Sequence, residues 1–243
     1  MGAGLFAWSV MEIIVVSIGA LSKNSLWSER VPVRTSHATT TLIKTVDEAA
    51  GGGKAVNVLV DPSLPFQILE QRIQERTGLK AADITHVFLT NWRPVHRRGL
   101  EGFSKAKWWM NQAEIDAANE ALDRADDAAH NQGAPADPVI EKERQLLAKV
   151  EAAPDALAEG VDLYPLIGYT PGQSGLLVSE ATRTTLIAGD AVPTAGHFMA
   201  GQVFQESWDL EKAKASLMEV YEVADIVVPG HDNWFLAPRA AGA

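Results

Sequence analysis

The stretch VFLTNWRPVHRRGLEGF, residues 87–103, decides the fold of this chain. Val87 to Thr90 predict a short buried strand, and a polar, basic loop with one histidine, His96, follows at once. Loops that leave a strand in this way often carry function, because the strand holds them rigidly. The layout is that of a metal-binding loop, although Asn, Arg and Val stand at most of the places where ligands would be expected.

The composition is that of an ordinary globular protein and excludes several kinds of chemistry. The 243 residues suffice for one large domain with a substantial core. A net charge of −10 disfavours binding to a phosphate backbone or an anionic membrane surface. The absence of cysteine rules out disulfides, thiolate ligands and a cysteine nucleophile. We expect one cytoplasmic domain over residues 1–243 that binds a small molecule, not nucleic acid or membrane; the sequence leaves the oligomeric state open.

The apolar stretch LFAWSVMEIIVVSIGAL, residues 5–21, is better explained as a buried strand than as a signal or membrane segment. No Lys or Arg precedes it, Glu12 interrupts it, and it is shorter than the ~20 apolar residues of a spanning helix. The β-branched run Ile13 to Val16 favours the strand. Met11 is an alternative natural start, which would make residues 1–10 an upstream extension.

Strands and helices are predicted on both sides of a helical middle. Strands are expected over 11–19, 38–45, 56–62, 84–90, 161–168, 174–180, 184–190 and 225–232, and helices over 66–78 and 209–224. Residues 112–153 are rich in Ala and acids and predict a helical insertion, which is either a solvated hairpin or a wall over a nearby site. Two such halves can pack sheet on sheet with the helices outside, which is an α/β fold.

Polar turns follow these strands in a fixed order. They are VLVDPSLP (58–65), the loop after VFLT (91–99), YTPGQSGLL (169–177), LIAGDAV (186–192) and IVVPGHD (226–232). In this order and spacing the chain resembles the metallo-β-lactamase superfamily over nearly its whole length. The resemblance implies a four-layer αββα sandwich with a two-metal site along one edge of the sheets.

The resemblance also implies that most metal ligands have been replaced. The family's His-x-His-x-Asp-His loop corresponds to Asn91, Arg93, Val95 and His96, and its next histidine to Tyr169. The first metal therefore loses all three of its own ligands. By the same resemblance, the family's bridging aspartate is Asp190 and its last histidine is His231.

The second metal position thus keeps His96, Asp190 and His231 and loses an aspartate at Val95. Two histidines and a carboxylate with open positions suit one Zn or Fe(II) ion. Such an ion lowers the pKa of a bound water or polarises a carbonyl oxygen. Ordinary two-metal hydrolysis is not expected, because valine cannot orient a water.

Arg93 supports the opposite expectation, in which no metal binds. Its guanidinium occupies a ligand position of the lost site and would repel a divalent cation nearby. It could instead pair with Asp190 and supply the missing positive charge. The alternatives are one bound metal ion or none.

Several other residues are candidates for the site, each with an alternative structural role. Candidate catalytic groups are Asp190, Arg93 and Tyr169, and candidate substrate contacts are Asn91, Arg97 and His197. Tyr169 could simply fill the space of a metal, Arg97 and Arg98 could be solvated, and His197 could bond its own loop. Asp61 resembles an aspartate that supports the metal loop. Trp92, Trp108 and Trp109 line either a pocket or the core.

Two functions follow from the sequence. The first is a hydrolase-like protein with a reduced site, acting on a small ester, amide, lactone or thioester. The second is a catalytically inactive member of the family that binds a ligand or a partner without metal.

Overall fold

The structure is a computed structural model that describes residues 11–47, 53–131, 135 and 137–238; the suggested extension, residues 1–10, lies outside this part. It contains two six-stranded sheets. The first has the order β1 (Glu12–Ser17), β2 (Thr40–Asp47), β3 (Lys54–Val60), β4 (His86–Leu89), β5 (Lys107–Met110) and β6 (Val150–Ala152). The second has the order β12 (Phe235–Leu236), β11 (Ile226–Pro229), β10 (Thr184–Gly189), β9 (Ser174–Ser179), β8 (Val161–Pro165) and β7 (Ala156–Ala158).

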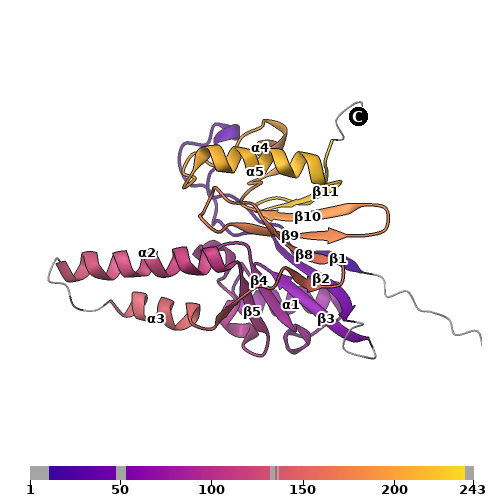
Figure 1. Cartoon of the computed structure of the whole chain (residues 1–243), viewed down its shortest axis with the longest axis horizontal. Helices are drawn as coiled ribbons and strands as arrows, with labels where there is room; N and C mark the ends of the chain where they lie inside the picture. The colour runs from indigo at the N-terminus through magenta and orange to yellow at the C-terminus, as the bar shows by residue number, and fades with distance from the viewer. Residues whose placement is uncertain (1–10, 48–52, 132–134, 136, 239–243) are drawn as a thin grey trace, which may run out of the picture.

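The helices cover the outer faces of the two sheets, so the predicted four-layer αββα sandwich is confirmed (Figure 1). The helices are α1 (Phe66–Thr77), α2 (Gln112–Asn131), α3 (Pro138–Leu147), α4 (Ala195–Met199) and α5 (Leu210–Val223). The innermost apolar cluster joins Phe88 and Trp109 of the first sheet to Leu176 and Val228 of the second. This cluster is the seam between the sheets, and it fixes the edge at which their loops meet.

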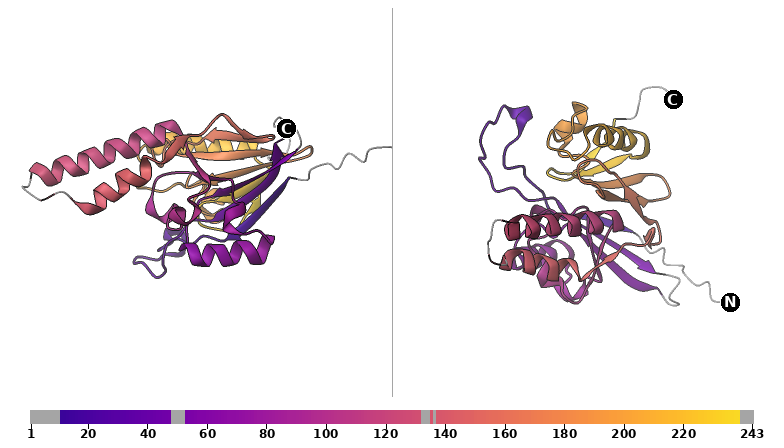
Figure 2. Two further views of the ribbon diagram at one scale, coloured as in Figure 1. Left: turned by 90° about the horizontal axis from the view of Figure 1, so that it is seen from below. Right: turned by 60° about the vertical axis from the view of Figure 1, so that its left-hand side comes forward.

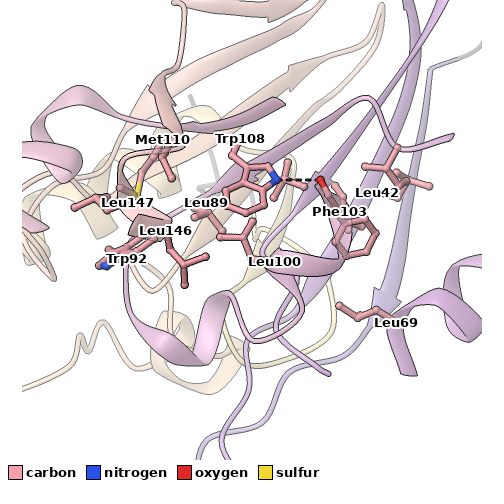
Figure 3. Close-up of a cluster of buried hydrophobic side chains, with 14 of the residues drawn as sticks. Leu42, Leu69, Leu89, Trp92, Leu100, Phe103, Trp108, Met110, Leu146 and Leu147 are labelled. Atoms are coloured by element: carbon pink, nitrogen blue, oxygen red, sulfur yellow. Dashed lines mark hydrogen bonds between the residues drawn. The ribbon is translucent and has the colours of Figure 1, made fainter. Parts of the chain in front are cut away.

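A second apolar cluster lies between the first sheet and helices α1–α3, and part of it is drawn in Figure 3. Trp108 is buried there and its indole N–H donates to the carbonyl of Phe103 at 3.0 Å. Trp109 stacks on His86 in the seam between the sheets, with ring centroids 4.1 Å apart. Both indoles therefore belong to the core, whereas Trp92 lines a pocket beside the site loops.

The predicted helix ends follow ordinary capping chemistry. Gly78 ends α1 in the left-handed conformation, with φ of 73°, which glycine adopts without steric cost. Asp209 caps α5 by accepting hydrogen bonds from the backbone N–H groups of Glu211 and Lys212. The face of α5 that carries Leu217 and Val220 packs on the second sheet.

The helical insertion is shorter than the sequence indicated. Helices α2 and α3 form a hairpin that projects from the body of the molecule (Figures 1 and 2). The prediction of helix up to residue 153 is wrong, because Val150–Ala152 pair with β5 as the parallel edge strand β6. Strands β5, β7 and β12, and helix α4, were also not predicted, since they are too short to show a period.

Strand direction brings the candidate loops to one edge. Strands β3, β4, β5 and β6 run parallel, and so do β10 and β11. The loops after β4, β10 and β11 therefore leave the sheets from strand ends that converge at the seam. Within the described residues, no helix is both long and apolar enough to cross a bilayer.

Leu217→Ala is expected to destabilise the protein by about 2–4 kcal/mol, because this leucine is 1% exposed between α5 and the sheet. Met218→Ala, one residue along on the outer face and 56% exposed, is the matched control and should change stability by less than about 0.5 kcal/mol. Urea unfolding measures both. Equal losses would contradict the assigned face of α5.

Candidate metal centre

Three loops bring His96, Asp190 and His231 together. His96 ends a 3-10 turn, Pro94–His96, that follows β4, whereas Asp190 and His231 follow β10 and β11. One ligand atom from each residue lies within 4.8 Å of the others, and all three side chains are buried. The juxtaposition expected from the sequence is therefore present.

His96 lies between two carboxylates. Its Nδ1 is 2.9 Å from Oδ2 of Asp61, and its Nε2 is 2.8 Å from Oδ2 of Asp190. Asp61 also accepts hydrogen bonds from the backbone N–H and the hydroxyl of Thr90. This network fixes the imidazole in one orientation, which is how a supporting carboxylate holds a metal-binding histidine.

His231 is held from the opposite side. Its Nδ1 donates to the carbonyl of His37 at 2.9 Å, so its Nε2 is directed to Asp190. That Nε2 lies 3.0 Å from Oδ1 of Asp190, within ion-pair distance but without hydrogen-bond geometry. Gly230 allows this approach, because a Cβ there would stand 2.5 Å from the same oxygen.

The electrostatics of the three residues are strongly coupled. Burial alone would lower the pKa of His96, but the charges of Asp190 and Asp61 and their hydrogen bonds raise it to about 10. Burial alone would raise the pKa of Asp190, but His96 and His231 hold it far below its usual range. In the metal-free protein His96 is an imidazolium, and Asp190 is ionised.

The structure favours a cation at this place. Oδ1 of Asp190 is buried and accepts no hydrogen bond from the described part of the chain. Buried carboxylate oxygens rarely lack a partner. Nε2 of His231 faces this oxygen and Nε2 of His96 faces the other carboxylate oxygen, Oδ2, while the second nitrogen of each ring is bound to a fixed oxygen acceptor. The set fits one divalent metal ion that accepts nitrogen and oxygen ligands.

Asn91, at the first position of the loop that the resemblance compares with a metal-binding loop, contributes an amide to the cluster. Nδ2 of Asn91 donates to Oε1 of Gln173 at 2.9 Å and to Oδ2 of Asp190 at 3.2 Å. Its own Oδ1 accepts the backbone N–H of Arg93 at 3.0 Å. Asn91 is fully buried among these partners. Its predicted role as a substrate contact is not tested by the structure and stays a prediction.

The expected ion pair between Arg93 and Asp190 is wrong. Arg93 is exposed, and its guanidinium lies over the ring of Tyr169, 4.6 Å from the centroid. Among residues 11–47, 53–131, 135 and 137–238 it forms no ion pair. The reason is that His96 already supplies a positive partner for Asp190, and stacking keeps the Arg93 guanidinium in contact with solvent.

Arg97 has structural partners. Its Nε donates to the carbonyl of Trp92 at 2.6 Å, and its guanidinium pairs with Glu143 of α3. These bonds engage the guanidinium within the protein. The predicted contact of Arg97 with an anionic substrate is not tested and stays a prediction. Arg98 is exposed.

Glu114 is a buried residue of the site region that the sequence analysis did not single out. Its carboxylate accepts the backbone N–H of Trp92 at 3.0 Å, the hydroxyl of Thr170 at 2.6 Å and the N–H of Gly172 at 3.0 Å. It therefore ties the first turn of α2 to two site loops. No sequence signal marks it, because it is one of many acids in the helical segment.

Tyr169 and His197 border a pocket of about 550 Å³ that Arg93, Val95, Phe204 and His231 also line. Burial, with a smaller effect of Asp190, raises the pKa of Tyr169 far above its usual range, so its hydroxyl stays protonated. Burial lowers the pKa of His197, which keeps it neutral. The pocket therefore opens directly beside His231.

Comparison with known proteins agrees with this geometry. The family model of the metallo-beta-lactamase superfamily matches residues 39–231. The chain belongs to this superfamily. Metallo-beta-lactamase domain-containing protein 1 of Xenopus laevis is 27% identical over 179 residues, which cover 72% of this chain and 66% of the frog protein.

Three solved structures share the fold of this chain. A Thermotoga maritima protein assigned to the metallo-beta-lactamases superposes with a TM-score of 0.64 at 17% identity, over 93% of this chain and 99% of that one. AidC, a dizinc quorum-quenching lactonase, superposes with a TM-score of 0.60 at 18% identity, over 84% of this chain and 77% of that one. A mutant of AiiA from B. thuringiensis superposes with a TM-score of 0.61 at 17% identity, over 91% of this chain and 92% of that one. At these identities the likeness establishes the fold alone.

Chelator-treated protein is expected to lose stability as the pH rises from about 7 to about 10.5. The folded pKa of His96 is about 10 against 6.5 for the free side chain, so its contribution is complete below about 6.5 and disappears as the pH passes about 10. A tenfold change in proton affinity is worth about 1.4 kcal/mol. Urea unfolding at a series of pH values measures the effect. His96→Gln has no imidazole to titrate, so its free energy of unfolding should fall less over the same pH range. Equal slopes of unfolding free energy against pH in the two proteins would contradict the buried imidazolium.

Proposed function

We propose that this chain is a hydrolase with one divalent metal ion, held by His96, Asp190 and His231, that acts on a small ester, lactone or thioester. One observation carries the proposal. The Nε2 atoms of His96 and His231, each ring anchored through its other nitrogen, both face the carboxylate of Asp190 in a buried cluster, and His231 lines a pocket beside it. Two imidazoles and a carboxylate held in this way form a ligand set for one divalent cation.

The metal, when bound, supplies Lewis-acid polarisation of a carbonyl oxygen or of water. The chain's own residues supply the rest of the site. Asp190 is a ligand and not a proton acceptor, because its pKa lies far below the working range. Tyr169 keeps its proton and offers a hydrogen bond to an oxygen of the substrate. Arg93, stacked on Tyr169, places a positive charge at the pocket rim.

The substitutions restrict the mechanism. Val95 stands where the resemblance places an aspartate, and Asn91 fills the first metal position with an amide donor. A reaction that needs two metals is therefore not proposed. AidC, a lactonase with the same fold, supports a carbonyl substrate as the first choice for testing.

A second candidate function is metal-free binding of a ligand. The observation that favours it is that His96 already bridges Asp61 and Asp190 without an ion, and that Asn91 adds a further donor to Asp190. In this form the pocket beside His231 would bind a small molecule without turning it over.

Protein purified without chelators is expected to contain about one Zn or Fe ion per chain, measured by elemental mass spectrometry. His231→Ala should abolish the binding, and Asp61→Asn should weaken it roughly 10–100-fold because the histidine ligand loses its orienting carboxylate. His130→Ala, on the exposed end of α2, is the matched control. Wild-type content below about a tenth of an equivalent would favour the metal-free function.

A panel of esters, lactones and thioesters, each assayed with and without added Zn, Mn or Fe, tests catalysis. We expect hydrolysis of at least one carbonyl class, dependent on metal and lost in His231→Ala, since that change removes a ligand and opens the cluster. Activity that survives in His231→Ala would assign the reaction to another protein in the preparation. A metal-loaded chain without activity would reject the proposed hydrolase function.

A further inference from the structure

Thr194 and His197 form a bonded pair at the start of α4. Thr194 is the N-cap of this helix, and its hydroxyl oxygen accepts the backbone N–H of His197 at 3.3 Å. The same oxygen lies 2.8 Å from Nδ1 of the His197 ring. Both side chains are buried, at 6% and 3% exposed.

The pair fixes which ring nitrogen carries the proton. The two contacts of the Thr194 hydroxyl within the described structure are the N–H of His197 and Nδ1. The N–H is a donor, so the hydroxyl proton has one acceptor available, which is Nδ1. A buried hydroxyl without an acceptor costs roughly 1–3 kcal/mol. Satisfying every group therefore makes Nδ1 an acceptor and leaves the proton of the neutral imidazole on Nε2.

The Nε2–H group lies on the side of the ring away from Thr194. Within the described residues, no protein group accepts a hydrogen bond from this N–H. Nε2 of His197 is also absent from the buried side-chain atoms that lack a partner, so it remains accessible. His197 lines the same pocket as Tyr169 and His231. Phe204 stands among the three rings, with centroids 5.0 Å from Tyr169, 6.0 Å from His197 and 6.2 Å from His231.

We propose that His197 is a substrate-contacting hydrogen-bond donor for a carbonyl oxygen, and that Thr194 is the positioning residue that sets its tautomer. The proposal deepens the hydrolase function above and rests on it for the identity of the ligand. Phe204 offers an apolar surface for the carbon chain next to that oxygen.

The negative charge that acts on His197 is that of Glu206, which favours an uncharged carbonyl over a carboxylate at this donor, although Lys23 and Arg93 line other parts of the same pocket. Glu206 lines the pocket and acts electrostatically on both His197 and Tyr169. A second carboxylate beside it would be repelled. A neutral ester or lactone oxygen accepts from Nε2–H without that penalty.

The tautomer is measured on the resting protein, without substrate or turnover. Long-range ¹H–¹⁵N spectra of ¹⁵N-histidine-labelled protein at pH 7.5 resolve the six histidines, and His197→Gln assigns the signal of His197. We expect a neutral ring with the proton on Nε2 in wild type, and a mixed tautomer in Thr194→Val, which keeps the shape and removes the hydroxyl. A proton on Nδ1, or an imidazolium, would overturn the assignment.

Binding of γ-octalactone, followed by chemical-shift titration of the same protein, tests the donor. His197→Phe should weaken binding roughly five- to tenfold, the loss of one hydrogen bond. His197→Gln, which keeps an N–H near the place of Nε2, should stay within about twofold of wild type. His130→Phe is the control, and hexanoate should bind more weakly than the lactone.

These outcomes separate the two proposals. Equal lactone affinity in wild type and His197→Phe would reject the donor role. A fixed Nε2–H tautomer with donor-dependent lactone binding, but with no metal and no turnover, would keep the role of His197 and reject the hydrolase.

Discussion

The buried carboxylate of Asp190 is the constraint on which the site depends. Removing a carboxylate from water costs several kcal/mol unless opposite charge and hydrogen bonds replace the solvent. Here two imidazoles and the amide of Asn91 surround it, and they come from the ends of strands in both sheets. Because each partner is anchored by a further group, the carboxylate also fixes how the loops of the two sheets meet.

The replaced ligands make a consistent set. Asn91 binds the carboxylate as a donor, so it does not compete for a metal as a histidine would. Arg93 turns outward onto Tyr169, which removes its charge from the cluster and covers one face of the ring. Asn91 thereby adds a donor to Asp190, whereas Nε2 of His96 and Nε2 of His231 both face the same carboxylate.

The projecting hairpin has a structural connection to the site. Glu114 in the first turn of α2 binds the loops that carry Trp92 and Thr170, and Arg97 pairs with Glu143 of α3. Burial of a carboxylate and of a guanidinium at these contacts couples the hairpin to the loops around the pocket. The insertion is thus a wall that holds the site loops, although its far end is solvated. The exposed acids of α2 take no part in this connection.

The sequence, through the resemblance of its ordered strands and polar turns to the metallo-β-lactamase superfamily, predicted the sandwich and the three residues that meet at its edge. It determined helices α1 and α5, whose period and caps are plain. It did not determine β6, β7 or α4, which are too short to show a period and are formed by pairing and packing. Nor did it locate Glu114, since one buried acid among many exposed ones leaves no pattern. Only the tertiary structure decided that His96, and not Arg93, is the positive partner of Asp190. The pairing of Asp190 depends on the distances between loops that belong to different sheets. The order of residues along the chain does not give these distances.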